Sequence, residues 1–258
     1  MRFILSLLIA FLASALSAQA PLPNFMRGCI ANLEYHGGVS ASGTWRDISG
    51  NGNDGTLSNL TAIEMTGLTQ GLTTPYVAGY VNLPATTASL KDATAATVEF
   101  WVYLTNSSGG ICLYDDCTNS NDFFRFAILY NFDTTDGADR LSFTRRDLNS
   151  GDQGARKTII ANTTMSRNAW HHIAAVLSVT DGVGNGFVKL YQDGVEVKSS
   201  TSSVYAMTST VSYGVRLAND FNTSAAGLLG YLDCFKLYKN RALPAEEIYQ
   251  HYKTGRRH

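Results

Sequence analysis

Short apolar runs recur along the chain between residues 29 and 238, and clusters of Gly, Asn, Asp, Ser and Thr separate them. In the run Ala-Thr-Val-Glu-Phe-Trp-Val-Tyr at 96–103, every second residue would share one face of an extended strand. The predicted strands are 29–35, 44–48, 76–83, 96–103, 123–132, 140–145, 157–161, 170–179, 187–192, 195–198, 213–218 and 228–238. Because no long helical period precedes residue 243, the pattern predicts an all-β sandwich or barrel.

The last apolar pattern has the spacing of a helix. Apolar residues recur at i, i+3, i+4 and i+7 over 245–252, so one face of a short helix would be apolar. Glu246 and Glu247 place negative charge in its first turn, and Gly255 is a suitable stop. Pro244 lies at the start, where proline is tolerated but supplies no side-chain cap. We therefore expect a short C-terminal helix that lacks a capping hydrogen bond.

The first residues have the pattern of a secretory signal peptide. Met1 and Arg2 precede an apolar run over 3–16, and small residues follow that run. We expect a signal peptide over residues 1–18, cut between residues 15 and 20, and a single domain over 21–258. The apolar run is shorter than the ~20 residues that a membrane-spanning helix needs, and no later run approaches that length. The sequence therefore predicts a secreted, extracellular protein without a membrane span.

Charge and cysteine content limit the possible partners and indicate possible disulfides. The chain carries 20 Lys and Arg residues against 21 Asp and Glu residues, a formal net charge of −1. This balance argues against a nucleic-acid partner, which favours a basic face. Four cysteines in a secreted chain indicate two disulfides, with three possible pairings. Cys112 and Cys117 enclose only a short segment, and a bridge between them would pin a turn and contribute about 2 kcal/mol.

Four motifs, in a fixed order along the chain, carry a family resemblance. They are D-I-S-G-N-G-N-D-G-T at 47–56, T-V-E-F-W-V-Y at 97–103, W-H-H-I-A-A-V at 170–176 with L-Y-Q-D-G at 190–194, and G-Y-L-D-C-F-K-L-Y-K-N-R-A-L-P-A-E-E-I at 230–248. Together they resemble the laminin-G-like, concanavalin-A-like lectin/glucanase domains. The resemblance implies an all-β fold, a two-sheet antiparallel jelly-roll sandwich with one short C-terminal helix. It is specific for the fold and not for a ligand.

The resemblance also implies contacts between the two ends of the chain. The first and last strands of such a jelly roll run side by side, which implies a Cys29–Cys234 disulfide. In the alternative, Cys29 or Cys234 is a free buried thiol.

Oxygen donors cluster in the opening loop at Asp47, Asn51, Asn53 and Asp54, and they are of the type that Ca²⁺ prefers. In the resembling fold this loop approaches the last strand, which implies that Asp233 joins the same site. A buried carboxylate without a partner is costly. We hypothesise one structural Ca²⁺ held by Asp47, Asp233 and loop carbonyls, with Asn51 and Asp54 in the same cluster. The alternative is a metal-free loop knitted by Asx turns.

The sequence gives little support for catalysis. Sandwich glycosidases use two carboxylates about 5 Å apart for retention, and on a strand this requires acids at i and i+2 or i+4. No such array occurs, and Glu99 is isolated on its strand. His171 and His172 are adjacent and point to opposite faces of a regular strand, so we expect structural roles for them. We therefore expect no enzyme activity.

Surface features supply the remaining candidate sites. Aromatic residues near strand ends are candidate sugar contacts, although the sequence does not distinguish them from core residues: Tyr114, Tyr130 and Phe132. Four N-x-S/T sequons fall in or near predicted turns: Asn59, Asn106, Asn162 and Asn222.

The combined features favour a secreted, non-catalytic binding module whose partner is a carbohydrate or glycoconjugate. The alternative is a structural or adhesive extracellular protein that binds protein partners or self-associates. A glycan-active enzyme of the same fold is a minor alternative.

Overall fold

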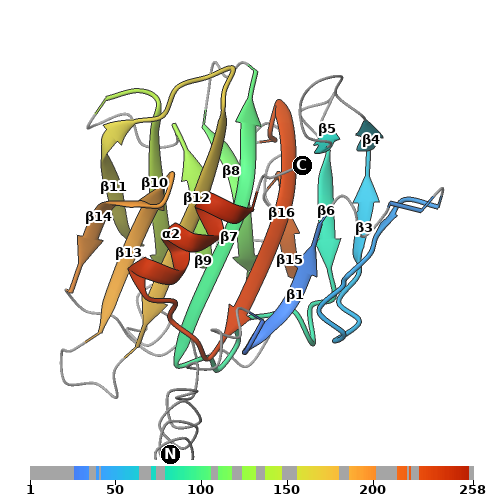
Figure 1. Cartoon of the computed structure of the whole chain (residues 1–258), viewed down its shortest axis with the longest axis horizontal. Coiled ribbons are helices and arrows are strands. Elements are labelled where there is room, and N and C mark those ends of the chain that lie inside the picture. The colour runs from blue at the N-terminus through green and yellow to red at the C-terminus, as the bar shows by residue number, and fades with distance from the viewer. Residues whose placement is uncertain are drawn as a thin grey trace, which may run out of the picture.

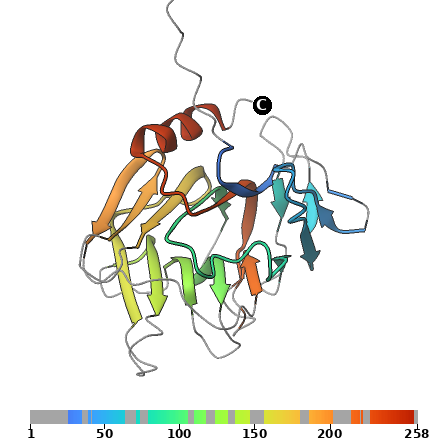
Figure 2. The same ribbon diagram turned by 90° about the horizontal axis from the view of Figure 1, so that it is seen from below.

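The chain folds as two antiparallel sheets packed face to face, and helix α2 (Ala245–Thr254) covers part of one sheet (Figures 1 and 2). This computed structural model describes residues 26–34, 39–40, 42–63, 71–73, 79–105, 110–117, 124–131, 137–146, 156–179, 186–201, 214–219, 221 and 227–255. We call the sheet beneath α2 the front sheet and the other one the back sheet.

The front sheet contains 8 strands. Their order is β14 (Val195–Ser200), β13 (Phe187–Gln192), β12 (Trp170–Ser178), β7 (Ala95–Leu104), β16 (Gly230–Lys239), β5 (Gly71–Thr73) and β4 (Thr61–Ile63), and β1 (Cys29–Leu33) also pairs with β16. The first and last strands therefore lie side by side, as the resemblance implied.

The back sheet also contains 8 strands. Their order is β11 (Arg156–Thr164), β10 (Arg140–Arg146), β9 (Phe124–Tyr130), β8 (Ile111–Cys117), β15 (Gly214–Leu217), β6 (Tyr80–Leu83), β3 (Gly55–Ser58) and β2 (Thr44–Trp45). Together the two sheets confirm the predicted all-β jelly-roll sandwich. Strand β8 was not predicted, because its two cysteines were interpreted as the ends of a closed turn.

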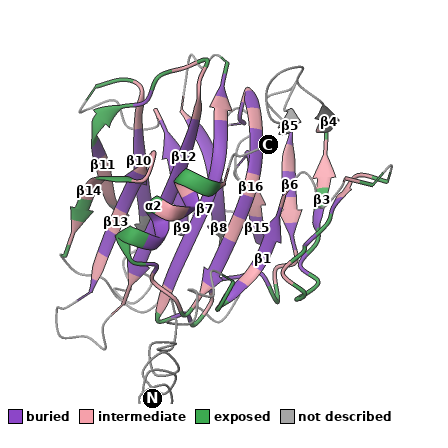
Figure 3. Cartoon of the chain, viewed as in Figure 1, coloured by how far each residue is buried: buried purple, intermediate pink, exposed green. Residues whose placement is uncertain are grey.

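The main core fills the space between the sheets. Alternate residues of β7, among them Val98, Phe100 and Val102, point into it, as the alternation of apolar residues predicted. Figure 3 shows the central strands of both sheets coloured as buried along most of their length. A smaller apolar cluster, which includes Tyr191 and Ile248, lies between the front sheet and α2. The helix thus covers a sheet face that would otherwise expose apolar side chains.

Helix α2 begins as the sequence predicted. Pro244 is its N-cap residue and makes no side-chain cap hydrogen bond, while Glu246 and Glu247 lie in the first turn. Glu247 instead receives two hydrogen bonds from the Arg241 guanidinium, at 2.8 and 2.7 Å, which fix the first turn to the preceding segment. Among the described residues, no helix has the length and apolar character of a membrane span.

The structure contradicts both predicted disulfides. Cys112 and Cys117 lie near opposite ends of β8, and five strand residues span about 16 Å, whereas a disulfide requires Cα atoms within about 7 Å. Cys29 is the register partner of Tyr238, so Cys234 lies four residues further along β16. Cys29, Cys112 and Cys234 are free thiols. The side-by-side packing of β1 and β16 was predicted correctly, but their register keeps the two sulfurs apart.

Candidate functional site

A row of polar and small side chains crosses the outer face of the back sheet. Its members are direct register partners, one on each of the seven neighbouring strands from β11 to β3: Thr158, Thr144, Ala127, Asp115, Arg216, Asn82 and Thr56. The residues beside them in sequence point the other way, into the main core: Phe143, Ile128, Tyr114, Leu217 and Val81. Because side chains alternate along a strand, these seven residues share the face away from the core. We call them the polar row.

The best-defined part of the polar row surrounds Arg216. The centre of its guanidinium lies 4.0 Å from the ring centroid of Tyr80 and 4.0 Å from that of Phe221, so the cation lies between two aromatic rings. Its Nε donates a hydrogen bond to Asn82 Oδ1 at 3.0 Å. Each such ring contact contributes about 0.5–1 kcal/mol at an exposed site. These contacts fix the orientation of the planar cation above the sheet.

Gly214 makes room for one of those rings. A Cβ atom at this position would lie 2.4 Å from the Phe221 ring, closer than side-chain atoms approach one another. The absence of a side chain on β15 therefore lets Phe221 lie across the strand and reach Arg216.

Exposure changes along the polar row. Asp115 and Thr144 are each 1 % exposed, whereas Arg216 and Asn82 are partly exposed and Thr56 is exposed. A ligand would therefore meet the β15–β6–β3 end first. This end offers guanidinium and amide donors, an amide carbonyl acceptor and two partly exposed rings, a combination that binds and orients polar ligands.

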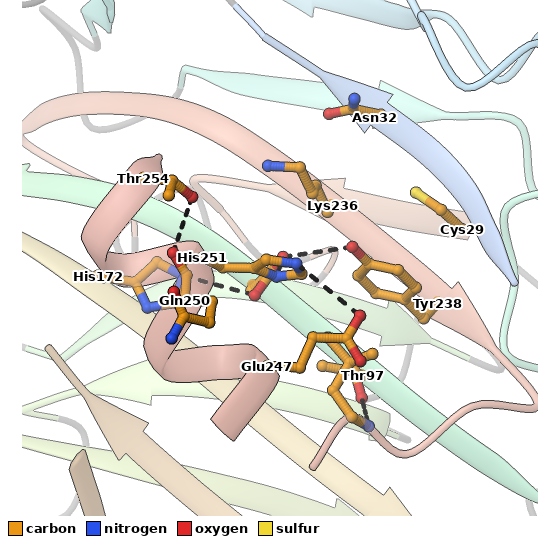
Figure 4. Close-up of polar contacts among 12 residues, drawn as sticks. Cys29, Asn32, Thr97, His172, Lys236, Tyr238, Glu247, Gln250, His251 and Thr254 are labelled. Carbon is orange, nitrogen blue, oxygen red and sulfur yellow. Dashed lines mark hydrogen bonds and ion pairs between the residues drawn. The ribbon is translucent and has the colours of Figure 1, made fainter. Parts of the chain in front are cut away.

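On the front sheet, the most deeply buried ionic group is Glu99. Its Oε1 accepts a hydrogen bond from His251 Nδ1 at 2.7 Å, and its Oε2 lies 3.5 Å from His172 Nε2 (Figure 4). Burial would raise the pKa of this carboxyl, but the two imidazoles outweigh burial and bring the pKa well below its ordinary value. Because His251 belongs to α2 and Glu99 to β7, the cluster fastens the helix to the sheet.

The two adjacent histidines have separate structural contacts, as predicted. His172 contacts the Glu99 carboxylate and lies 5.4 Å from the Trp101 ring. His171 donates from Nδ1 to Asp193 Oδ2 at 2.7 Å, and its Nε2 lies 2.9 Å from Ser166 Oγ and 3.1 Å from the Ser166 carbonyl oxygen. The second set of contacts ties the β13–β14 turn to the segment that precedes β12.

The predicted ligand-contact aromatics are wrong where the structure describes them. Tyr114 and Tyr130 are both 0 % exposed and belong to the main core. The Tyr114 ring stacks on Phe235 at 5.9 Å, and the Tyr130 hydroxyl donates to Asp139 at 2.7 Å. Phe132 lies outside the described residues. Among the residues whose burial is described, the partly exposed aromatics beside the back sheet are instead Tyr80 and Phe221, which no sequence pattern had indicated.

Hydrogen bonds to the Asp47 carboxylate hold the opening loop (47–56) in place. Its Oδ1 accepts from the backbone N–H of Asn32 at 2.9 Å and of Ser49 at 2.8 Å. Its Oδ2 accepts from the Ser49 hydroxyl and from the Asn53 N–H, both at 2.8 Å. Asp54 Oδ1 in turn accepts from the Asp47 N–H at 2.7 Å. These bonds are those of the metal-free alternative, with Asx-type turns closing the loop.

The structure does not assemble the predicted calcium ligands into one site. Asp233 lies on the front sheet opposite Trp101 of β7, and Asp47 bridges to Leu33 of β1. Asn51 uses its side-chain amide to donate to the Cys29 carbonyl at 3.0 Å. Within the described ranges, no group of three or more His, Cys, Asp or Glu residues is placed to hold a metal. Calcium binding by the loop itself stays a prediction.

Two of the four sequons can be located. Asn59 is exposed in a bend, and Asn162 is exposed but lies within β11, where its Oδ1 accepts a hydrogen bond from Lys198 at 3.0 Å. Asn106 and Asn222 lie outside the described residues. Glycosylation stays a prediction for all four positions.

Comparison with known proteins agrees with this architecture. A laminin G family model, described as the concanavalin A-like lectin/glucanases superfamily, matches residues 76–249. No curated protein sequence matches the chain.

Several solved structures share the fold at low sequence identity. The binding domain of Paraclostridial Mosquitocidal Protein 1 has a TM-score of 0.63 and 16% identity over 90% of this chain and 53% of that chain. A Trypanosoma rangeli sialidase has a TM-score of 0.64 and 15% identity over 90% of this chain and 33% of that chain. Domain 4 of AbnA, an extracellular arabinanase of Geobacillus stearothermophilus solved with arabinotriose, has a TM-score of 0.59 and 15% identity over 86% and 97%, respectively. The chain thus spans about half of the toxin domain and a third of the sialidase.

Proposed function

Because the chain belongs to the concanavalin A-like lectin/glucanase superfamily, we propose that it is a secreted, non-catalytic domain that binds carbohydrate. The observation that carries the proposal is the exposed end of the polar row, where Arg216 lies between Tyr80 and Phe221 and beside the Asn82 amide. Sugars present hydroxyl groups around an apolar ring face, so their sites combine a few fixed polar groups with aromatic surface. This end of the sheet provides both.

The comparison with the arabinanase domain supports the choice of ligand class. That domain was solved with arabinotriose, and the alignment covers 97% of it. The proposed absence of hydrolysis has a separate support. Hydrolysis by two carboxylates needs a second acid about 5 Å from the first, and Asp115 is the acid that the described strands place on the outer face of the back sheet.

The test is binding of the full secreted chain to an array of neutral and acidic glycans, followed by calorimetry with each ligand found and with arabinotriose. Arg216→Gln removes the charge between the two rings, and we expect it to weaken binding at least tenfold, equivalent to about 1.4 kcal/mol. Arg167→Gln is the matched control, because Arg167 is a partly exposed arginine that pairs with Asp139 instead. We expect this control to bind like the unmodified chain.

Two further measurements complete the test. Release of reducing ends from bound glycans would contradict the non-catalytic part, and N-terminal sequencing of the secreted protein would locate the cut between residues 15 and 20. An array without any bound glycan would contradict the carbohydrate proposal. Ordered self-association in sedimentation would then favour the structural or adhesive alternative.

A further inference from the structure

Three aromatic side chains meet on the outer face of the front sheet, opposite to the polar row. Tyr103 of β7 is the register partner of Trp170 of β12 on one side and of Tyr231 of β16 on the other. Their sequence neighbours Val102, Leu104 and Leu232 point into the main core, so the three rings face outward. We call Tyr103, Trp170 and Tyr231 the aromatic triad.

The rings of the aromatic triad form one contiguous group. Their centroids are 5.8 Å apart for Tyr103–Trp170, 5.4 Å for Tyr103–Tyr231 and 6.3 Å for Trp170–Tyr231. The two Tyr103 pairs are steeply inclined, at 66° and 64°, as edge-to-face rings are. This geometry fixes each ring against its neighbours and leaves ring edges and faces of different orientation at the surface.

Helix α2 stops short of the aromatic triad. The end of the helix packs on Trp101, the outward-facing residue of β7 that precedes Tyr103. Tyr252 stacks on the Trp101 ring at 5.7 Å, and a Cβ at Gly255 would lie 2.9 Å from Trp101 Nε1. The ends of β7, β12 and β16 that carry the triad extend past the helix (Figure 1). All three residues of the triad are partly exposed.

The size of the aromatic triad limits what it can bind. A whole aromatic side chain offers roughly 150–250 Å², so three partly buried rings expose about 250 Å² at most. A stable protein interface needs about 800 Å² per partner. The aromatic triad by itself is therefore much smaller than a stable protein interface, and its size suits a short segment of a sugar chain.

The composition of the triad points to the same ligand. Tyr and Trp combine an apolar ring with a polar tip, and a sugar ring likewise combines apolar C–H groups with hydroxyls. Asp233 lies two residues from Tyr231 on the same face of β16, so an acidic sugar on the triad would place a second acidic group beside this carboxyl group.

From these observations we propose that the aromatic triad is a second carbohydrate-binding site, which stacks a neutral sugar ring within an oligosaccharide. It lies on the opposite side of the sandwich from the polar row. One chain would then bind two glycans that face in opposite directions and link them.

Trp170 provides a direct readout. It is partly exposed, whereas Trp45 and Trp101 are buried at 0 and 6 % exposure, so a sugar on the triad should change chiefly the emission of Trp170. We would titrate the full chain with arabinotriose, xylotriose, cellotriose, laminaritriose and maltotriose. The expected result is a saturable change in emission with at least one of them.

Variants assign that signal to the triad. Tyr231→Leu and Tyr103→Leu keep much of the apolar bulk, and in folded variants of unchanged circular dichroism they should weaken the binding at least tenfold. Tyr249→Leu is the matched control, since Tyr249 is exposed on α2, and it should bind like the unmodified chain. Loss of the signal in the control as well would overturn the assignment.

The two sites are separated by their own variants. Arg216→Gln should leave the Trp170 signal unchanged, even where it abolishes binding of another glycan on the array. A signal that disappears in Arg216→Gln, or no saturable change with any of the five trisaccharides, would overturn the second site. The first of these results would leave the polar-row proposal intact. A Trp170 signal without any effect of Arg216→Gln on glycan binding would instead overturn the polar-row proposal.

Discussion

Glu99 should be among the side chains that contribute most to stability. Its side chain is 1 % exposed, and its Oε1 accepts a hydrogen bond from His251 Nδ1 of α2 at 2.7 Å, while its Oε2 lies 3.5 Å from His172 Nε2 of β12. Removing one member of a buried ionic group leaves the others desolvated and without their partner, which costs about 3–5 kcal/mol. We therefore expect Glu99→Ala to lower the free energy of unfolding by about that amount. For a chain of this size, the melting temperature should fall by roughly 10 °C.

Urea unfolding followed by tryptophan fluorescence and far-UV circular dichroism measures this difference. Glu196→Ala is the matched control: Glu196 pairs with Lys189 at 2.9 Å, but both side chains are about a third exposed. Pairs of this kind contribute about 0–1 kcal/mol. The reasoning is refuted if Glu99→Ala stays within about 0.5 kcal/mol of the unmodified chain, or if the control loses as much.

The pH dependence of stability gives the same group a second test. The pKa of Glu99 is lowered in the folded chain, so its stabilising contribution is complete above the unfolded-state value of about 4.3. That contribution is lost as the pH falls through the lower folded-state pKa. Glu99→Gln keeps the shape but cannot titrate, so its stability should decline less steeply below pH ~4.3 than that of the unmodified chain. Equal slopes would count against the lowered pKa.

Three further outcomes follow from the described contacts. Tyr114→Ala should lower the free energy of unfolding in urea by about 3–5 kcal/mol, because it empties a ring-sized part of the core. The folded variant should still bind glycans as before. A loss of binding without destabilisation would instead show that Tyr114 contacts the ligand. If the loop binds calcium as the sequence predicts, EDTA should lower the melting temperature and CaCl₂ should restore it. An unchanged melting temperature would instead favour a loop closed by the hydrogen bonds to Asp47 alone. Burial raises the pKa of the Cys29 thiol to about 12, so it should resist iodoacetamide at pH 8 in the native chain. After unfolding without reductant, Cys29, Cys112 and Cys234 should all be alkylated in peptide maps, whereas a disulfide-linked peptide between any two of them would contradict their free state.

Local patterns predicted the main strands and the helix, because those elements follow from side-chain alternation and helical spacing that the sequence displays directly. The prediction that Tyr114 contacts a ligand was wrong, and the reason also lies in the local structure of its strand. A β-bulge between Cys112 and Tyr114 shifts the register, so the strand turns Tyr114 into the core. The bulge has no clear signal in the sequence, and without it the direction of this ring could not be predicted.

The candidate site was harder to predict because its parts are distant in the sequence. Alternation with Val215 and Leu217 indicates that Arg216 faces outward. Its aromatic neighbours, however, come from β6 and from Phe221 beyond the end of β15, and only the order of strands in the sheet brings them together. The Cys29–Cys234 pairing was wrong for a similar reason, since it depended on the register between β1 and β16, which no local sequence pattern determines.

The pairing of β1 with β16 has a consequence for how the chain is made. These partners, such as Cys29 and Tyr238, are about 200 residues apart, and contacts of such long range slow folding because a large loop must close first. During synthesis from the N-terminus, β1 can bond to the nearby Asp47 loop, but its partner strand in the front sheet, β16, emerges only when the chain is nearly complete. The front sheet should therefore be completed only after β16 is available, so the chain would remain incompletely folded, and suited to export in an unfolded form, until its synthesis is almost finished. Refolding in a stopped-flow instrument should accordingly show a slow final phase, and a fast single phase would contradict this order.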